Sequence, residues 1–582
     1  MKHILATVLL LIGFETAAPA RGASLSPELQ SVNPASNVDV IVHFTRSPTA
    51  GQHQIVRDLG GVLKASLGLI QSASYSIPAA RLKELAANPN VISISPNHRV
   101  HMLLDNTTAA VNAVAAWNVG LDGSGIGVAV IDSGISAHDD LKGDGGSRVV
   151  YRESFSGGDG NDAFGHGEHV AGILAGNGAD SNCAICDRHF VGLAPNANLI
   201  DLQVLDANGE GSDSEVIAAI SRAIELQSQY NIRVINLSLG RPVYESYSLD
   251  PLCQAVESAW KAGIVVVVAA GNGGRDNPAG NNGYGTIMAP GNDPYVITVG
   301  AMKSMGTPHR ADDLVASYSS KGPTQIDHIV KPDLLAPGNM VVSLRSPDGT
   351  LTKSFPANQV PLSYYQQTVG QKLSTSYFTL SGTSMATPVV SGAVALLLQA
   401  HPELTPDQVK ARLMRTAYKN FPATSTAYDS SVGKSFTSEY DVFTIGAGYL
   451  DIEAALADTA PVRGTAHSPT AYYSTNLLVS ILGTLLGGNT GTATISCNAG
   501  SVCDSPSLLG TQSIWGTQSI WGTQAVSSDQ SIWGNQSIWG TQSIWGTQSI
   551  WGTQSIWGTK SISGIATVDP VEGMKIVANG EN

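Results

Sequence analysis

The sequence is poor in charge, and positive charge is the scarcer sign. Charged residues make up 13% of the 582 residues, and 32 Lys and Arg stand against 46 Asp and Glu, a formal net charge of −14. Proteins that bind nucleic acid need a basic surface for the phosphates, so this balance argues against a nucleic-acid partner. Low charge beside abundant Gly, Ser, Thr and Asn is common in secreted proteins.

Long apolar runs are also lacking. The run near the N-terminus, Ile4–Phe14, would cover only about half of a bilayer core of ~30 Å at about 1.5 Å per residue. Lys2 and His3 precede it, and a small-x-small cleavage site ends at Ala20. Residues 1–20 are therefore predicted to be a secretory signal peptide. We expect a secreted protein, either extracellular or in the periplasm or at the cell surface, with no membrane span.

Cysteine is scarce and odd in number, with five residues. In an oxidising compartment Cys183 can pair with Cys186 and Cys497 with Cys503, which leaves Cys253 alone. The alternative is a zinc site on Cys183, Cys186 and the histidine three positions further on, but the sequence offers no fourth ligand. A loop disulfide or free thiols are therefore expected rather than zinc.

Residues 35–104 form a first compact unit. Val38–Phe44 alternates between apolar and polar residues as a strand does, Pro78–Ala87 has the spacing of a helix, and Val91–Pro96 forms a second strand. Two strands and helices in so short a stretch predict a small α+β domain. By itself this unit indicates no function.

From Val111 onward, strongly apolar strands alternate with helical stretches. The strands are Ile126–Asp132, Leu199–Val204, Arg233–Ser238 and Gly263–Ala270, and the helices include Ser214–Tyr230 and Pro251–Ala262. Strands without polar alternation, separated by helices, predict a parallel sheet covered on both faces. Ligands of such sheets bind at the carboxyl ends of the strands. Asp132 ends one strand there, and Gly271-Asn272-Gly273 follows another.

Ser384 stands between a glycine-led turn and a helical run. The stretch Ser381–Pro388 is followed by Val389–Ala400, which is apolar and strongly helical. The hydroxyl of Ser384 is thus expected at the N-terminus of a buried helix, where free N–H groups and the helix dipole favour developing negative charge. A capped helix start is the alternative that this stretch alone would allow.

His166 opens another helix, within Gly165–Gly172. A metal-binding pair on one helix face needs histidines at i and i+4, whereas His166 and His169 are three apart and have no third ligand. The flanking glycines let other backbone approach the ring. A general base is therefore the preferred interpretation of His166.

Asp132, His166, Asn272 and Ser384 together can carry out acyl transfer. Serine is a poor nucleophile at its own pKa, so an imidazole must accept its proton, a carboxylate must orient that imidazole, and an amide must donate to the oxyanion. Singly, these residues are explained by a strand cap, a packed core histidine and a turn. Their joint presence favours the chemistry.

With these residues the chain resembles the subtilisin-like serine proteases, whose catalytic residues follow the order Asp, His, Ser. The resemblance covers about residues 108–457 and depends on five motifs in the family's order. They are Val130–Ile135, His166–Gly172, Asn236–Gly240, Ala269–Asn272 and Gly382–Pro388. The resemblance implies that Ser384 is the nucleophile, His166 the general base and acid, and Asp132 the orienting carboxylate. Asn272 and the Ser384 N–H would form the oxyanion hole, and the chemistry needs no cofactor.

The resemblance also implies a substrate edge at Ser238, Leu239 and Gly240, on which a peptide adds as a β-strand with loose sequence preference. Met288 lies where many relatives have glycine at the base of the first specificity pocket. This departure predicts a shallower pocket and a preference for smaller side chains. The next peptide bond, Ala289–Pro290, is expected to be cis.

Two further positions depart from or only partly match the family pattern. Glu168 stands where the family usually has threonine, and its carboxylate would raise the pKa of His166 if it points inward. Asp140 matches a usual position for a structural calcium ligand. The loop Asn177–Asp187, which should supply the remaining ligands, is altered and carries the cysteines, so the resemblance implies a calcium ligand at Asp140 without the rest of the ligand set.

By the same resemblance residues 35–104 are an inhibitory propeptide, a folding chaperone whose C-terminal end occupies the active site. Cleavage would fall near Met102–Asp105, and the catalytic domain would span residues 105–457. A permanently attached accessory domain is the alternative.

The C-terminal part is dominated by a repeat. Residues 458–506 are predicted to be a linker and β-rich segment, residues 507–566 repeat Ser-Ile-Trp-Gly-Thr-Gln, and residues 567–582 are a tail. A period of six places every Trp on one face of a β-structure and every Ile on the other, whereas a helix would scatter them. We expect a solenoid of short strands whose Trp face binds glycan, the cell envelope or the chain itself. A low-complexity tail or a covered stacking core is the alternative.

The sequence thus predicts a secreted serine endopeptidase that acts on proteins or peptides, made as a zymogen with broad specificity. Its fold would be α/β, a mostly parallel sheet with helices on both faces, preceded by a small α+β domain and followed by a β-rich repeat extension. The competing hypothesis is a surface or glycan-binding protein with an inactive protease-like body. The intact set of catalytic residues argues against that alternative.

Overall fold

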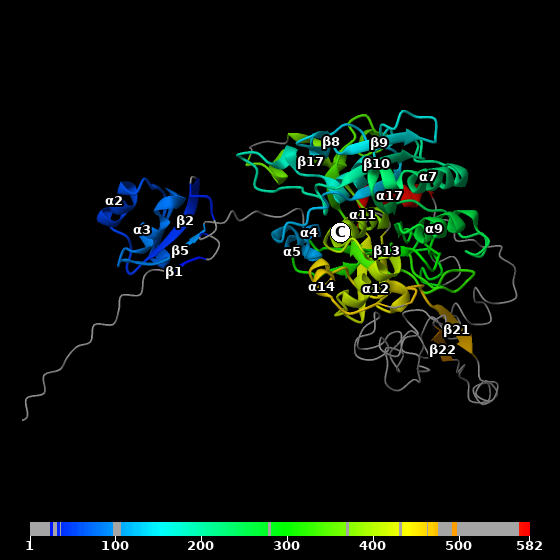
Figure 1. Ribbon diagram of the computed structural model, residues 1–582. Helices are drawn as coiled ribbons and strands as arrows, with labels where there is room; N and C mark the ends of the chain where they lie inside the picture. The colour runs from blue at the N-terminus through cyan, green and yellow to red at the C-terminus, as the bar shows by residue number, and fades with distance from the viewer. Residues whose placement is uncertain are drawn as a thin grey trace, which may run out of the picture. The chain divides into compact units, whose positions relative to one another are not determined.

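The computed structural model describes residues 24–26, 29, 32–34, 36–96, 106–276, 281–367, 372–429, 433–462, 464–474, 492–496 and 570–581. The chain divides into two compact units, Met1–His101 and Met102–Asn582, and each is described by itself (Figure 1). The predicted signal peptide (1–20), the cleavage segment near Met102–Asp105 and the repeat at 507–566 lie outside the described residues.

The first unit is a five-stranded sheet in the order β1-β5-β2-β4-β3, with the helices α2 and α3 among its described residues. Its elements are β1 (Ser24–Leu25), β2 (Asn37–Phe44), α2 (Ala50–Asp58), β3 (Val62–Leu67), β4 (Ser72–Pro78), α3 (Leu82–Ala86) and β5 (Val91–Pro96). The strands β2 and β5 and the helix α3 match the prediction. The strands β3 and β4 were not predicted. β4 buries the small polar side chains Ser72 and Ser74, which hides the alternation that strand prediction needs.

The second unit contains an eight-stranded sheet in the order β14-β13-β12-β11-β6-β10-β9, with β15 also paired to β13. The strands are β6 (Gly127–Asp132), β9 (Val149–Ser154), β10 (Asn198–Gln203), β11 (Ile232–Leu237), β12 (Val265–Ala269), β13 (Ile297–Lys303), β14 (Leu314–Val315) and β15 (Leu334–Pro337). All pairings are parallel except that of β13 with β14. The strands β6 and β12 are buried along their whole length, as the unbroken apolar sequences predict.

Helices cover this sheet on both faces. The α-helices that the structure describes in the second unit are α4 (Thr107–Ala110), α5 (Ala113–Asn118), α6 (Gly167–Ala175), α7 (Asp213–Glu225), α8 (Gln227–Tyr230), α9 (Pro251–Lys261), α10 (Thr350–Ser354), α11 (Thr383–Ala400), α12 (Pro406–Thr416), α13 (Val442–Ile445), α14 (Ile452–Ala457) and α17 (Pro570–Asn579). The helix α7 packs on α9, and α6 packs on α11, and each pair contacts sheet strands. The α/β architecture predicted from the sequence is therefore present.

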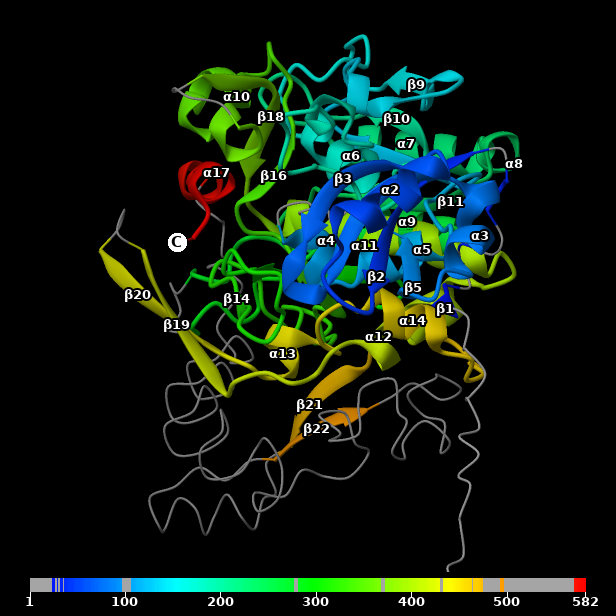
Figure 2. The same cartoon turned by 90° about the vertical axis from the view of Figure 1, so that its left-hand side faces the viewer.

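Smaller sheets surround this body. They are β7 (Lys142–Gly143) with β8 (Gly146–Ser147), β16 (Val341–Leu344), β18 (Leu373–Leu380) and β17 (Gln359–Pro361) in that order, β19 (Thr424–Asp429) with β20 (Lys434–Glu439), and β21 (Thr470–Ser474) with β22 (Thr492–Ser496). The helix α17 was not predicted, since residues 567–582 were expected to be only a tail. Figure 2 shows α17, in red, next to β18, which it contacts.

Among the described residues, α11 alone is long and apolar enough to cross a membrane, and 83% of it is buried inside the protein. Its hydropathy is that of a core helix.

Cys183 and Cys186 form a disulfide with an S–S length of 2.09 Å, in agreement with the predicted pairing, and Cys253 is a buried free thiol. Cys497 and Cys503 lie outside the described residues.

Candidate active site

Three neighbouring parallel strands bring site residues to one edge of the sheet. The strands β12, β11 and β6 lie side by side. Asp132 is the last residue of β6, Ser238 follows β11, and Asn272 lies three positions past β12. His166 immediately precedes α6, and Ser384 is the second residue of α11. The fold therefore gathers the predicted residues at strand ends and helix N-termini.

A cleft of about 620 Å³ contains most of the predicted site. His166, Asn272, Ser384, Met288 and the segment Ser238–Gly240 all line it. The reacting groups and the predicted substrate edge thus share one cavity.

His166 is held by Asp132. Nδ1 of the imidazole lies 2.7 Å from Oδ1 of the carboxylate, and the two residues are 7% and 1% exposed. The same oxygen accepts the Ser133 N–H at 2.8 Å. Burial lowers the pKa of His166, but attraction to Asp132, their hydrogen bond and the nearby Asp162 outweigh it, so the pKa is raised. A carboxylate in this position stabilises the imidazolium that forms when the ring takes up a proton.

Ser384 is tied to the end of strand β11. Its Oγ donates a hydrogen bond to the carbonyl oxygen of Ser238 at 3.0 Å, and Oγ of Ser238 donates to the Ser384 carbonyl at 2.8 Å. The Ser384 hydroxyl must leave this acceptor before it can pass its proton to His166. The two serines also fix the distance between the nucleophile and the substrate edge.

Asn272 is oriented as a donor. Its Oδ1 accepts the Thr383 N–H at 2.9 Å and the Thr383 hydroxyl at 3.2 Å, which leaves Nδ2 for the cleft. Gly382 has φ +143°, and a Cβ there would come within 3.2 Å of Nδ2 of Asn272. Glycine at this turn therefore keeps the amide unobstructed. Nδ2 and the backbone N–H of Ser384 at the start of α11 are both suited to an oxyanion.

Met288 fills space between two glycines of the cleft. A Cβ on Gly271 would lie 2.7 Å from Cγ of Met288, and a Cβ on Gly240 would lie 3.2 Å from its Cβ. The Ala289–Pro290 peptide is cis, as predicted. Arg241 pairs with Ala289 through N–H to O contacts of 3.0 and 2.8 Å, so the segment carrying Met288 is fixed against the substrate edge.

Glu168 points inward but acts on other groups. It is 1% exposed, and its carboxyl accepts the backbone N–H of Ser136. Burial, with repulsion from Asp162, raises the pKa of Glu168 well above its usual value. A carboxyl that stays protonated attracts an imidazolium weakly. The carboxylates that raise the pKa of His166 are Asp132 and Asp162, so the hypothesis that Glu168 does so is wrong.

His169 is part of the core. Its Nε2 lies 3.1 Å from the carbonyl oxygens of Val341 and of Phe378. Burial and the nearby His166 lower its pKa to about 3. The ring therefore bonds to backbone of β16 and β18 and is no partner of His166 in metal binding.

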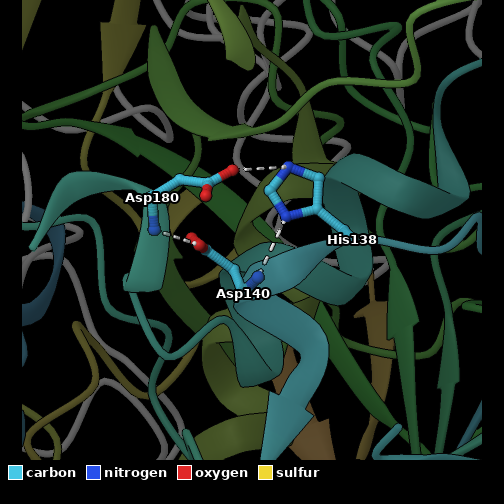
Figure 3. Close-up of side chains that lie close together, drawn as sticks. All are labelled: His138, Asp140 and Asp180. Atoms are coloured by element: carbon cyan, nitrogen blue, oxygen red, sulfur yellow. Dashed lines mark hydrogen bonds and ion pairs between the residues drawn. The ribbon is translucent and has the colours of Figure 1, made fainter.

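His138, Asp140 and Asp180 form a cluster whose candidate ligand atoms all lie within 4.8 Å of one another (Figure 3). Oδ1 of Asp140 accepts the Asp180 N–H at 2.8 Å, and Oδ2 accepts the Tyr377 hydroxyl at 2.8 Å. Nδ1 of His138 accepts the Asp140 N–H at 3.1 Å. Calcium takes six to eight oxygen ligands, whereas this cluster offers a nitrogen and carboxylates that are bonded within the protein. The donor set does not fit calcium, and the predicted role of Asp140 finds no support in it.

Sequence reasoning missed several residues of the cleft wall. Phe164, the loop 208–213 after β10, and Met574 and Val577 of α17 all line it. The Asn-Gly-Glu-Gly sequence at 208–211, a turn at the carboxyl end of a parallel strand, was an available signal for the loop. No local pattern pointed to α17.

A buried carboxylate paired with an imidazole, beside a serine at a helix N-terminus and an amide donor, is the arrangement of a serine hydrolase. Residues 123–439 match the subtilase family, peptidase S8. This match spans more than half of the chain. The chain belongs to the subtilase family.

Relatives agree with this assignment. The chain is 39% identical over 385 residues to serine protease AprX of Bacillus subtilis strain 168, covering 64% of this chain and 79% of AprX. It is 33% identical over 375 residues to subtilisin E of the same strain, covering 63% and 81%. It is 30% identical over 426 residues to a thermostable alkaline protease of Halalkalibacterium halodurans, covering 71% and 92%. The protein is a subtilisin-like serine endopeptidase, a hydrolase, as predicted.

Proposed function

We propose that this subtilase is a secreted endopeptidase of broad specificity, made as a zymogen, in which Asp132, His166 and Ser384 form the triad. The observation that carries the proposal is the 2.7 Å contact between His166 and Asp132 beside a cleft that also contains Ser384 and Asn272. The chemistry needs no group other than those of the chain. The competing hypothesis, a surface or glycan-binding protein with an inactive body, is supported by no specific observation.

In the proposed reaction Oγ of Ser384 attacks the scissile carbonyl and Nε2 of His166 accepts its proton. Asp132 holds Nδ1–H and stabilises the imidazolium. Nδ2 of Asn272 and the Ser384 N–H donate to the oxyanion. His166 then protonates the leaving amine, and water repeats the sequence on the acyl-enzyme, which returns the free serine.

The substrate would lie along Ser238, Leu239 and Gly240 as an added strand. Backbone hydrogen bonds of this kind depend little on side chains, which supports broad specificity. Met288 sets the depth of the first pocket, and its position against Gly240 and Gly271 supports a preference for smaller side chains.

Secretion and zymogen activation follow from the N-terminal part of the chain. The signal-like residues 1–20 support export. Residues 35–104 correspond to most of a separate compact unit, which supports a propeptide that is cut off near Met102–Asp105. The tryptophan repeat at 507–566 would then bind glycan, envelope or another copy of the chain.

The test is to produce the chain without residues 1–20 beside its Ser384→Ala variant and to follow intact mass over time. We expect the wild type to lose the segment that ends near Met102–Asp105 and then to cleave casein, while the variant stays whole. If both chains stay whole and neither cleaves casein, the inactive-body hypothesis replaces this one. A wild type that cleaves casein without losing the segment makes residues 35–104 a permanent domain.

A further inference from the structure

The C-terminal helix α17 lies in the cleft that holds Ser384. Its residues Met574 and Val577 line the same cavity as His166. The carbonyl oxygen of Val577 accepts a hydrogen bond from the backbone N–H of Ser381 at 2.8 Å, three positions before Ser384. This helix therefore fills part of the cleft and takes up a backbone N–H donor close to the nucleophile.

The chain end beyond α17 is anchored by a carboxylate-binding site. Oε2 of Glu581 accepts the Ser317 N–H at 2.9 Å and the Ser317 hydroxyl at 2.6 Å, and it lies 3.1 Å from a guanidinium nitrogen of Arg275. Nδ2 of Asn339 donates to the Glu581 carbonyl at 2.7 Å, and the Glu581 N–H donates to Oδ1 of Asn339 at 2.8 Å. The Arg275 and Glu581 side chains are 4% and 2% exposed. A carboxylate buried this deeply needs such partners.

The turn between α17 and this anchor admits only glycine. Gly580 has φ +60°, and a Cβ there would lie 2.3 Å from Oγ of Ser381 and 2.9 Å from Oδ1 of Asn339. The carbonyl of Ala578, two positions before Gly580, accepts a hydrogen bond from the side-chain amide of Asn358. Ala578, Gly580 and Glu581 therefore each contact the catalytic body or depend on its shape.

One anchor residue shares a loop with the proposed oxyanion donor Asn272, and another lies beside a residue that binds the nucleophile turn. Arg275 lies three positions after Asn272 in one loop. Asn339 follows Gly338, whose carbonyl accepts the Gly382 N–H at 2.7 Å in the nucleophile turn. Arg275 and Asn339 are therefore each only a few residues or one hydrogen bond away from the backbone of the active site.

The hydrogen bonds of the tail avoid the groups proposed to hold the acyl part of a substrate, although Met574 and Val577 line the same cleft as those groups. Within the part of the tail that the structure describes, the polar partners are Ser381, Asn358, Asn339, Ser317 and Arg275, and none of these belongs to the edge at 238–240 or to the first pocket. Because α17 takes up the Ser381 N–H in the nucleophile turn and leaves the edge at 238–240 without a hydrogen bond from the tail, we expect it to obstruct the part of the substrate beyond the scissile bond.

We propose that Pro570–Glu581 is a tethered inhibitor, anchored through Glu581 to Arg275, Ser317 and Asn339, that excludes substrates extending past the scissile bond. This proposal rests on the proposed function. A tail that is docked nine times in ten would leave about a tenth of the enzyme open to such substrates.

The experiment compares two substrates. One is a peptidyl p-nitroanilide, which has acyl residues and a small leaving group, and the other is an internally quenched peptide that extends on both sides of the cleaved bond. The processed enzyme is compared with a variant that lacks residues 570–582, with intact mass confirming that the tail is retained in the first. We expect kcat/KM for the extended peptide to rise about tenfold on deletion, and that for the anilide to stay the same.

Point variants separate the anchor from the helix. Glu581→Gln removes the charge of the anchor, and Gly580→Ala blocks the turn. Each variant should raise kcat/KM for the extended peptide part or all of the way to the value of the deletion variant. Asn579→Ala is the matched control, because Asn579 is exposed on the same helix. A synthetic peptide of residues 570–582, added to the deletion variant, should restore inhibition, and the same peptide with Glu581→Gln should inhibit more weakly.

Two results overturn the proposal. If deletion leaves both substrates unchanged, the tail does not obstruct the cleft. If deletion lowers both rates together, α17 is a structural wall of the site. In either case, if the enzyme hydrolyses the anilide and Ser384→Ala abolishes that hydrolysis, the proposed function stands. The proposed function and the proposed inhibition by the tail are therefore tested separately.

Discussion

Nδ1 of His166 lies 2.7 Å from Oδ1 of Asp132, and both side chains are buried. A carboxylate can only accept here, so Nδ1 carries the proton of the neutral ring and Nε2 is the basic nitrogen. The contact thus fixes the tautomer that a general base needs. It also raises the pKa of His166 against the effect of burial.

The pH dependence of the enzyme should report this contact. Only the neutral imidazole accepts a proton, so kcat/KM should rise with pH through an ionisation above the ordinary histidine pKa of 6.5. Asp132→Asn removes the attraction and leaves the burial, so the acid limb should move to lower pH. The plateau should fall by about 10⁴, because an amide allows the wrong tautomer. An acid limb that does not move in Asp132→Asn would contradict this account of His166.

Asn272 should act on the transition state and hardly on binding. Asn272→Asp keeps the oxygen that accepts from Thr383 but replaces the free donor with an acceptor. We expect kcat to fall by at least about 10²–10³, the range known for the oxyanion amide of this family, with KM nearly unchanged. Asn272→Ala, which loses both roles, serves for comparison. A loss that appears mainly in KM would show that Asn272 holds substrate instead.

Met288 should limit the size of the side chain before the cleaved bond. Met288→Ala removes the Cγ and Sδ atoms that crowd Gly271 and deepens the pocket. In a series of peptidyl anilides ending in Ala, Leu and Phe, the Phe to Ala ratio of kcat/KM should rise about tenfold or more. Met305→Ala is the control, because Met305 is 43% exposed and lies outside the walls of this cleft. An unchanged ratio would place the base of the pocket elsewhere.

Residues at the ends of strongly patterned elements were predictable. Asp132 ends a strand without a polar interruption, and Asn272 follows another, so their meeting at one sheet edge follows from the parallel arrangement. His166 and Ser384 each stand in a glycine-flanked helix start. In these cases the local sequence determines both the element and the end at which the residue lies.

Contacts between distant segments were not predictable. Glu581 meets Arg275 across 306 positions of the chain, and no pattern in Pro570–Asn579 points to the cleft. The hydrogen-bond partner of Glu168 is another example, since Ser136 lies 32 positions before it. The position of Glu168, two residues after His166, suggested an interaction with His166 that the structure does not have.

The stability of the fold should depend on a buried charge cluster formed by Lys331, Asp333 and Lys410. Nζ of Lys331 lies 2.7 Å from Oδ2 of Asp333, and Nζ of Lys410 lies 3.2 Å from Oδ1. All three side chains are 0% exposed. Asp333→Ala removes the carboxylate in direct contact with two buried ammonium groups, so the free energy of unfolding should fall by about 3–5 kcal/mol. Urea denaturation of the Ser384→Ala background, which prevents self-cleavage, measures this loss.

The loss should shrink as the pH rises. Burial lowers the pKa of Lys410 from 10.5 to about 7 in the folded protein, and Asp333 opposes that effect. Between pH 7 and 10.5 the unfolded chain binds more protons at this lysine than the folded one does. The contribution of Lys410 to the free energy of unfolding therefore increases with pH. Removal of Asp333 widens the difference, so Asp333→Ala should recover part of its stability between pH 7 and 10. The control is Asp139→Ala, which breaks the exposed contact with Lys142 at 2.5 Å and should change nothing measurable. Equal losses in the two variants would mean that the buried cluster contributes no more than a surface ion pair.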